Sequence, residues 1–421
     1  MAELLEVALA AWRDCPASLP PFARAYSTAD QAVRERHLDR FLDRIQGEMR
    51  HPPRTRPERK AAHARLTGAF AEFGRAALGF EDRHLELMLE GGFSAVGTSL
   101  ARQARRFDPS VSAADILQAS RNAWTACGLQ KLLGRSMRLT PAIFAYSMLY
   151  PYTDNYLDDP ATSAETKRCF SARFGARLAG GLIAPENRYE ATIWRLIETI
   201  EGEYSRADYP QVFESLLGIH RAQEDSIRLL DRGPACTGDD VLRLGFAKGG
   251  ASVLVDGYLA TGSLTAGQAG FVFDWGVLLQ LADDLQDVRE DRQAGVRTLF
   301  SQAAGQAPLD ALTARTLQFG RRAMLRMHQL GAADGALPQL LEMSCVALVV
   351  RSAGAAGEFH TRSFLEAIEA QSPFRFAFLD DRRRRFDKRK PLLARLFEAF
   401  LAGDDDEPAF PLLPGSLISR I

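Results

Sequence analysis

Residues 280–291 have the sequence QLADDLQDVRED and directly follow a long apolar segment. Asp283, Asp287 and Asp291 are four residues apart, so on an α-helix they share one face, and Asp284 lies beside them. Like charges at this spacing destabilise a helix by roughly a few tenths of a kcal/mol per pair, so the acidic face calls for a compensating cation. Magnesium fits because it prefers oxygen ligands and is usually shared between carboxylates and substrate phosphates.

Helix-forming residues dominate on both sides of this stretch, and alternating β-branched runs are nearly absent from the 421 residues. Apolar residues at a period of 3.6 predict helices at 58–78, 81–107, 112–135, 140–158, 163–182, 187–204, 208–231, 238–262, 265–292, 308–330, 335–355, 359–371 and 388–402. This many helices with short connections predict an all-α protein built as a large helical bundle.

Three regions are predicted along the chain. The stretch HPPRTRP at 51–57 is the clearest break, and it separates an N-terminal helical extension (1–57) from the main helical domain (58–402). The remaining residues, 403–421, contain three successive aspartates and three prolines and are expected to form a C-terminal tail.

The composition limits the possible partners and location. With a net charge of −1, no overall field favours nucleic acid or an anionic membrane. Five scattered cysteines without zinc spacing indicate a reducing compartment, and no uncharged apolar run is long enough for a membrane span. Without a basic leader segment, we expect a cytoplasmic protein. The basic run at 380–390 is interrupted by acids, so we expect a solvated loop or lid near the ligand rather than a nucleic-acid site.

A second acidic cluster lies in YPYTDNYLDDP at 150–160, at the end of an aromatic segment. Asp154 and Asp158 are four residues apart and share one helix face, with Asp159 next to them. The 129 residues between positions 154 and 283 suffice for about four helices that bring the two clusters face to face across a bundle. The alternative is that each cluster is a solvated acidic face.

Cations between and after the clusters are candidates for binding a diphosphate. Lys248 lies in FAKGGAS (246–252), where we expect the double glycine to break the helix and expose backbone to the ligand. Arg297 follows the second cluster, and Arg243 is a further candidate. Each of the three could instead be an ordinary surface charge.

These residues together resemble the class I isoprenoid synthase superfamily, which includes trans-prenyl diphosphate synthases, squalene and phytoene synthases, and class I terpene synthases. DDLQD at 283–287 resembles the second DDxxD motif of the prenyltransferases, and 280–295 resembles the QLxxxxxDVxEDxxxG stretch of squalene and phytoene synthases. Asp283, Asp287 and Asp291 fall where terpene synthases carry their second metal triad. The first cluster is DxxxDD rather than DDxxD, and the resemblance covers about residues 115–300.

The resemblance implies a fold, a cofactor and a site. The fold would be the helical bundle of the class I isoprenoid (terpenoid) synthases, often a homodimer, acting on an isoprenyl diphosphate with Mg²⁺, three ions being present with substrate bound. The implied metal ligands are Asp154, Asp158, Asp159, Asp283, Asp284, Asp287 and Asp291. The implied diphosphate ligands are Lys248, Arg297 and Arg243, and the aspartates at 154, 158, 283 and 287 would be catalytic.

Departures from the family patterns favour one reaction over another. Chain-elongating relatives carry a GKRxRP-like segment and an arginine pair for a second diphosphate. This chain has only GRSMRLTP (134–141) and a misplaced Lys167–Arg168. The sequence thus predicts a terpene synthase-like lyase that ionises one allylic diphosphate. A prenyltransferase that couples two diphosphates is the alternative, and a non-catalytic helical scaffold is the alternative of another class.

Aromatic and histidine residues are further candidates for roles in the site. Five aromatics could stabilise a carbocation or could form an ordinary core: Tyr146, Tyr150, Phe246, Tyr258 and Trp275. Because a diphosphate leaves as an anion, no general acid is required, and the scattered His84, His220 and His360 are predicted to be core or surface residues.

Overall fold

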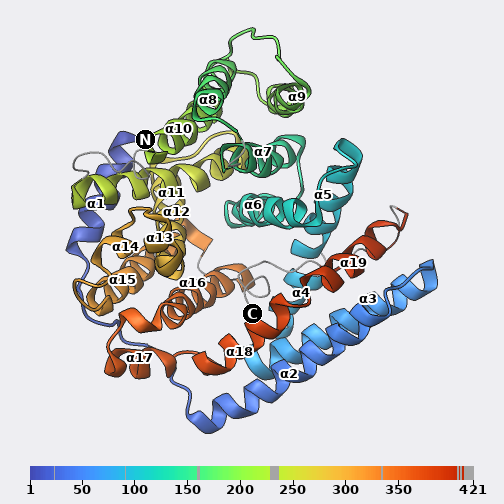
Figure 1. Cartoon of the computed structure of the whole chain (residues 1–421), viewed down its shortest axis with the longest axis vertical. Coiled ribbons are helices and arrows are strands. Elements are labelled where there is room, and N and C mark those ends of the chain that lie inside the picture. Colours follow the sequence, from blue (N-terminus) through green and yellow to red (C-terminus); the bar gives the residue numbers. More distant parts are fainter. Residues whose placement is uncertain are drawn as a thin grey trace. The chain divides into compact units, whose positions relative to one another are not determined.

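The structure, a computed structural model, describes residues 1–22, 24–90, 92–158, 162–227, 237–332, 335–404, 407 and 410–411; for Asp154, Asn155, Asp158, Ile227 and Ala332 it describes the backbone alone. All regular secondary structure in these residues is helical (Figure 1), so the all-α prediction is confirmed.

The helices follow one another with short connections. In chain order they are α1 (Ala2–Asp14), α2 (Thr28–Arg50), α3 (Arg56–Phe73), η1 (Gly74–Leu78), α4 (Asp82–Leu89), α5 (Phe93–Phe107), α6 (Ala113–Leu132), α7 (Pro141–Asp158), α8 (Ala164–Leu178), α9 (Arg188–Glu203), α10 (Pro210–Ile227), α11 (Gly238–Thr261), α12 (Ala266–Gln286), α13 (Val288–Ala294), α14 (Leu299–Ala303), α15 (Asp310–Met327), η2 (His328–Ala332), α16 (Ala336–Ala355), η3 (Gly357–Phe359), α17 (Arg362–Glu369), α18 (Phe376–Asp387) and α19 (Lys390–Leu401).

The chain divides into two compact units that do not coincide with the predicted ranges. Unit 1 comprises 1–21, 129–136 and 140–364, and unit 2 comprises 22–128, 137–139 and 365–421. The predicted boundaries at 57 and 402 both fall inside unit 2, whereas α1 belongs to unit 1. Both predicted acidic clusters and all three predicted cations are in the chain segments of unit 1.

Helices α11 and α12 form the centre of unit 1. Each begins with a capping box, Thr237 with Asp240 and Thr265 with Gln268, which satisfies backbone N–H groups at the helix start. The two helices cross at glycines: a Cβ on Gly249 would lie 2.8 Å from the carbonyl oxygen of Gly276. The backbones therefore approach more closely than larger residues would permit.

This crossing corrects the prediction that the double glycine at 249–250 breaks the helix. Helix α11 runs without interruption from Gly238 to Thr261, and both glycines are buried against α12. Glycine costs a helix interior about 1 kcal/mol relative to alanine, and the close packing against α12 offsets that cost. The helix break predicted from the low helix propensity of glycine is wrong because tertiary packing against α12 outweighs that propensity.

Three other helix predictions need correction. The helix predicted at 265–292 is two helices, α12 and α13, joined at Asp287, whose φ of −95° and ψ of 12° leave the α-helical range. The helix predicted at 81–107 is likewise divided into α4 and α5, with Gly92 in a non-helical conformation before α5. The basic run at 380–390, predicted as a loop or lid, lies mostly in helix α18.

The N-terminal helix is part of the core of unit 1. Trp12 of α1 packs edge-on against Phe246 of α11 and Phe319 of α15, with ring centroids 5.8 and 6.0 Å apart. Trp12 is only 2% exposed. Burial of a large aromatic residue on this scale fixes α1 against the helix that carries Lys248.

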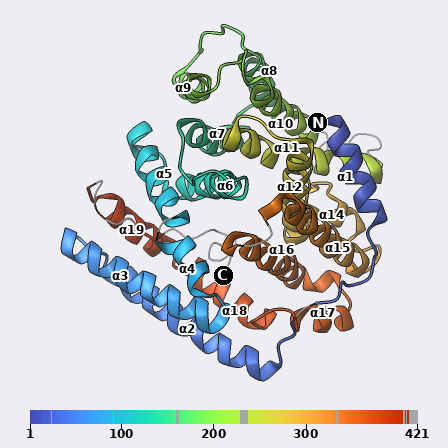
Figure 2. The same ribbon diagram turned by 180° about the vertical axis from the view of Figure 1, so that it is seen from behind.

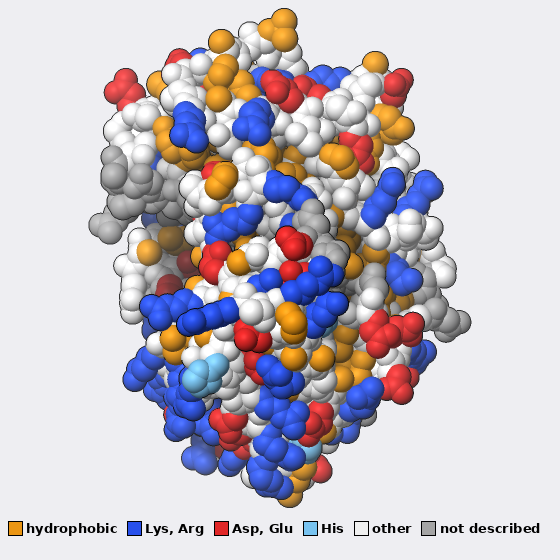
Figure 3. Space-filling model, turned by 90° about the vertical axis from the view of Figure 1, so that its right-hand side faces the viewer, with side chains coloured by type: hydrophobic (Ala, Val, Ile, Leu, Met, Phe, Trp, Pro, Cys, Tyr) orange, Lys and Arg blue, Asp and Glu red, His pale blue; other side chains and the backbone are white. Residues whose placement is uncertain are grey.

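Unit 2 is built around α2 and α3, which lie side by side in both ribbon views (Figures 1 and 2). Phe41 of α2 stacks on Phe73 of α3 with ring centroids 5.0 Å apart, and Phe374 from the C-terminal part stacks on Phe73 at 6.2 Å. Ion pairs between the helices, such as Arg44 with Glu72 at 2.8 Å, lie at the surface. The face in Figure 3 carries many Lys and Arg side chains with Asp and Glu among them.

Helix α16 is apolar enough to be tested as a membrane span. It is the single such helix in the part of the chain that the structure describes, and 44% of its apolar window is buried inside the protein. Core helices of the same length and composition meet the same criterion, so α16 is weak evidence for a membrane segment.

Candidate functional site

The second acidic cluster keeps its predicted register across the junction of α12 and α13. The amide of Asp287 donates to the carbonyl of Asp283 at 2.9 Å, and the amide of Asp291 donates to the carbonyl of Asp287 at 2.8 Å. These hydrogen bonds have the i to i−4 pattern of an α-helix, so the three aspartates form one ladder. Asp283 is exposed, whereas Asp287 and Asp291 are half-buried.

Asp284 is the buried member of the cluster. It is 9% exposed, accepts a hydrogen bond from Gln280 Nε2 at 2.7 Å, and lies against α11, where a Cβ on Gly245 would be 3.9 Å from its Oδ2. Burial raises the pKa of Asp284 to about 7, and Asp283 adds repulsion, while Gln280 and Lys248 act in the opposite direction. This carboxyl therefore connects the acidic ladder to α11.

Asp291, at the other end of the ladder, also has a raised pKa. Burial raises its pKa to about 6, with further repulsion from Asp287 and Asp283, while a hydrogen bond from Thr298 lowers it. At both ends of the ladder, repulsion from neighbouring carboxyls adds to the effect of burial, and positive charge nearby would lower both pKa values. A bound divalent cation would supply the missing positive charge.

The predicted cations differ in position. Lys248 is half-buried on α11, three residues after Gly245, and it lowers the pKa of Asp284, so it lies on the side of α11 that faces the cluster. Arg297 is half-buried between α13 and α14 and forms no ion pair with any residue that the structure describes.

Arg243 lies elsewhere. It is paired with Glu6 of α1, with Nη1 and Oε2 3.3 Å apart, and this pairing raises the pKa of Arg243. Arg243 and Lys248 are five positions apart in the sequence, which corresponds to about 140° around an α-helix. The structure thus groups Lys248 with the acidic ladder and directs Arg243 towards α1.

The first acidic cluster is described only in part. Asp154 and Asp158 lie on α7 by their backbone, but their side chains, and the whole of Asp159, are outside the described residues. Helix α7 contacts α11, because Tyr146 Oη donates to the carbonyl of Ser252 at 3.2 Å. Ser252 is one helical turn from Lys248, so α11 contacts both α7 and α12, the helices that carry the two clusters.

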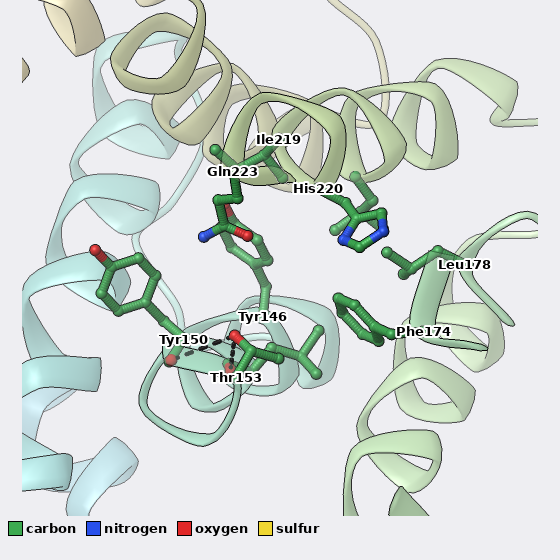
Figure 4. Close-up of a pocket in the computed structure, with 10 residues that line it drawn as sticks. Tyr146, Tyr150, Thr153, Phe174, Leu178, Ile219, His220 and Gln223 are labelled. Carbon is green, nitrogen blue, oxygen red and sulfur yellow. Dashed lines mark hydrogen bonds between the residues drawn. The ribbon is translucent and has the colours of Figure 1, made fainter. Parts of the chain in front are cut away.

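A small, partly open apolar pocket lies between α7, α8 and α10 (Figure 4). Helices α7 and α10 each contribute residues at positions i, i+3, i+4 and i+7, and α8 contributes two residues one turn apart. The lining consists of Tyr146, Leu149, Tyr150, Thr153, Phe174, Leu178, Leu216, Ile219, His220 and Gln223. Because Tyr150 and Thr153 line it, the pocket begins within one turn of residue 154.

The five predicted cation-stabilising aromatics separate into two groups. Tyr146 and Tyr150 line the pocket. Phe246 packs into the core with Trp12 and Phe319, and Trp275 stacks on Phe271 with centroids 5.9 Å apart. Tyr258 is half-buried and is not among the residues that line the pocket.

Sequence reasoning missed the pocket residues that come from α8 and α10. Phe174, His220 and Gln223 belong to no motif, and His220 was predicted as a core or surface residue; it is 7% exposed and lines the pocket. The available signal was the stripe at 216, 219, 220 and 223 on one face of α10, which periodicity alone assigns to an ordinary core.

The aspartates provide the oxygen ligands that magnesium prefers, but they do not form a closed cage. In the described ranges no three His, Cys, Asp or Glu residues converge closely enough to hold one metal ion. Magnesium typically uses one or two carboxylates together with substrate phosphates, so an open ladder such as 283, 287 and 291 is chemically compatible with it.

Comparisons with known proteins leave the family open. No protein-family model matches the chain, and no curated protein matches it. Among solved structures, a decaprenyl diphosphate synthase from Rhodobacter capsulatus is similar, with a TM-score of 0.39 and 14% sequence identity, over 64% of this chain and 99% of that chain. A TM-score this low carries no argument for a common fold or a common function.

Proposed function

We propose that this chain is a magnesium-dependent enzyme of the class I isoprenoid synthase type, which ionises an allylic isoprenyl diphosphate and releases a terpene and diphosphate. The observation that carries the proposal is the ladder of Asp283, Asp287 and Asp291, with Lys248 facing it from α11. The apolar pocket between α7, α8 and α10 belongs to the same unit and supports a hydrocarbon substrate.

The diphosphate end of the site needs positive charge. Mg²⁺ held by the acidic ladder and the basic side chains of the protein would provide it together. Asp283, Asp287 and Asp291 would hold Mg²⁺ from α12 and α13, and residues 154, 158 and 159 would do so from the end of α7. Bound Mg²⁺ supplies Lewis-acid charge that stabilises a departing diphosphate. Lys248 and Arg297 would bind diphosphate oxygens directly through charge-assisted hydrogen bonds.

The buried Asp284 is a positioning residue in this proposal. Its carboxyl accepts from Gln280 and lies against α11 near Gly245, so it fixes the distance between the ladder and the helix of Lys248. A hydrogen-bonded carboxyl in an apolar contact is costly to leave unpaired, which keeps α11 and α12 in register at this level.

The hydrocarbon end of the site needs a dry pocket with aromatic faces. Tyr146 and Tyr150 lie on the same side of α7 as residue 154, so the pocket continues from the proposed metal site along the helix. A cation over such a ring gains about 0.5–2 kcal/mol. Tyr146 is 7% exposed and Tyr150 is 36% exposed, which supports a pocket that opens near Tyr150.

Ionisation without coupling is favoured over prenyl transfer because the sequence lacks the cation set for a second diphosphate. Lys167 and Arg168 stand on α8, two turns after the first cluster in sequence, instead of directly after it. With one diphosphate site, the allylic cation reacts with a double bond of its own hydrocarbon or loses a proton.

The test is an incubation of the purified chain with Mg²⁺ and allylic diphosphates of increasing length, with and without isopentenyl diphosphate. We expect diphosphate release and a hydrocarbon or alcohol product without isopentenyl diphosphate. A lengthened diphosphate or a head-to-head hydrocarbon would show a coupling enzyme instead. If no substrate released diphosphate, the chain would be a scaffold with a degenerate site.

A further inference from the structure

We propose that His220 is the base that ends the reaction: it accepts a proton from the carbocation held in the pocket between α7, α8 and α10, so that the product is an olefin. This assignment rests on the proposed ionisation of an allylic diphosphate and adds the class of product to it. The observation behind it is an imidazole in the wall of the apolar pocket.

His220 is chemically unique among the ten residues that line the pocket. The others are Tyr, Leu, Thr, Phe, Ile and Gln residues, none of which accepts a proton near neutral pH. The hydroxyls of Tyr146 and Thr153 donate to backbone carbonyls, at 3.2 Å to Ser252 and at 2.9 Å to Leu149. The imidazole is therefore the one lining group with a basic nitrogen.

The imidazole is held in place by α8. A Cβ on Gly175 would lie 2.6 Å from His220 Nε2, so the glycine provides the space that the ring occupies. Phe174 meets the ring edge-on, with centroids 5.2 Å apart and an interplanar angle of 89°. Any residue larger than glycine at 175 would push the ring out of this position.

The imidazole lies at the end of the pocket away from the proposed diphosphate site. Figure 4 shows His220 with Phe174 and Leu178 at one end and Tyr150 at the other. Tyr150 is one turn from residue 154. A base at the far end acts on positive charge that has moved along the hydrocarbon, after the diphosphate has left.

The surroundings keep the ring ready to accept a proton. Burial lowers the pKa of His220, while Glu224 and the carbonyl of Ser171 raise it and Arg221 lowers it further. From α7, Tyr146 and Tyr150 line the pocket, and neither side chain has a basic nitrogen. A neutral imidazole adds no positive charge beside the carbocation and has one unprotonated nitrogen.

The proton transfer balances without another reactant. A C–H bond next to the cationic carbon breaks, its electron pair forms the carbon–carbon double bond, and the proton moves to the imidazole. Glu224 Oε1 lies 3.7 Å from His220 Nε2 and would stabilise the resulting imidazolium. Because the Glu224 side chain is 45% exposed and accepts from Ser171 Oγ at 2.6 Å, it connects the ring to solvent for release of the proton.

The test compares His220→Gln with wild type and with His360→Gln. His360 is a matched control, since it is also buried in unit 1 but bonds Thr313 at 2.8 Å and does not line the pocket. We measure diphosphate release and the ratio of olefin to alcohol from one allylic diphosphate. In His220→Gln the olefin fraction should fall at least about tenfold and water-quenched alcohol should appear, whereas His360→Gln should keep the wild-type ratio.

A second measurement needs no variant. In wild type the ratio of olefin to alcohol should fall as the pH drops below the lowered pKa of His220, because the imidazole becomes protonated. An unchanged ratio in a folded His220→Gln chain, or a wild-type ratio independent of pH, would overturn the role of His220 alone. Absence of diphosphate release from wild type would overturn the ionisation itself.

Discussion

Glu407 of unit 2 and the acidic ladder of unit 1 have opposite electrostatic surroundings. In unit 2, Glu407 is paired with Arg59, with Oε2 and Nε 2.6 Å apart, and this hydrogen bond lowers the pKa of Glu407 to about 2. In unit 1, the pKa of Asp284 is raised to about 7 and that of Asp291 to about 6. Glu407 has an arginine partner, whereas burial and neighbouring aspartates raise the pKa values of Asp284 and Asp291.

The difference shows how residues of one type serve two purposes. A carboxylate with an arginine partner stabilises the folded chain while it is ionised. A crowded carboxylate without enough cations costs stability when ionised, which proteins accept mainly where function needs the charge. Three experiments test whether this division between the Glu407 pair and the acidic ladder holds.

The largest effect should come from the ladder. Replacing Asp287 by alanine should lower Mg²⁺-dependent diphosphate release by about a hundredfold to a thousandfold, because a charge that stabilises the leaving group is lost. Glu72→Gln is the control: this acid pairs with Arg44 at the surface of unit 2, at 2.8 Å, and its loss should leave the rate unchanged. If Asp287→Ala and Glu72→Gln lost diphosphate release equally, the acidic ladder would not differ in function from a surface ion pair.

A smaller effect should separate the two predicted cations of α11. Lys248→Gln should lower kcat/KM by about tenfold to a hundredfold, since charged hydrogen bonds contribute about 1.5–3 kcal/mol. Arg243→Gln should change it by less than about threefold, because Arg243 is paired with Glu6 of α1. Steady-state kinetics of diphosphate release give both values; a larger loss from Arg243→Gln would place the diphosphate on the α1 side.

The smallest effect on activity, and a clear effect on stability, should come from the Arg59–Glu407 pair. Glu407 has a folded pKa of about 2, below its ordinary value of 4.5, so its contribution is present above pH 4.5 and is lost as the pH falls towards 2. Arg59→Leu should therefore lower the Tm at pH 7 more than at pH 2, with diphosphate release unchanged. Calorimetric melts across this range measure both losses, and an equal loss of Tm at pH 7 and pH 2 would show that the pair does not stabilise the folded chain.

The sequence predicted most of the fold because the helix signals are local. Capping residues such as Thr237 and Thr265 and apolar periodicity place α11 and α12 within one or two residues of the predicted ends, apart from the junction at Asp287. The predicted helix break at the double glycine, 249–250, is wrong because the role of these glycines depends on Gly276, a residue on another helix. Local patterns do not contain that information.

The candidate site was predictable to the extent that it depends on spacing. The ladder at 283, 287 and 291 is predicted by its four-residue steps, and the amides of Asp287 and Asp291 each donate to the carbonyl four residues earlier, although the helix is divided at Asp287. The sequence ranks Arg243 below Lys248 and Arg297, but it does not predict the pairing of Arg243 with Glu6, because that contact depends on the packing of α1. The pocket residues of α8 and α10 depend on tertiary packing and carry no motif.

Binding of inorganic diphosphate, measured by titration calorimetry with excess Mg²⁺ and again with a chelator, tests the central claim most directly. The wild-type chain should bind diphosphate with Mg²⁺ and lose at least about a hundredfold in affinity without it, and Asp283→Ala combined with Asp287→Ala should abolish the Mg²⁺-dependent part. Equal binding with and without the metal, or full Mg²⁺-dependent binding by the double variant, would contradict the account.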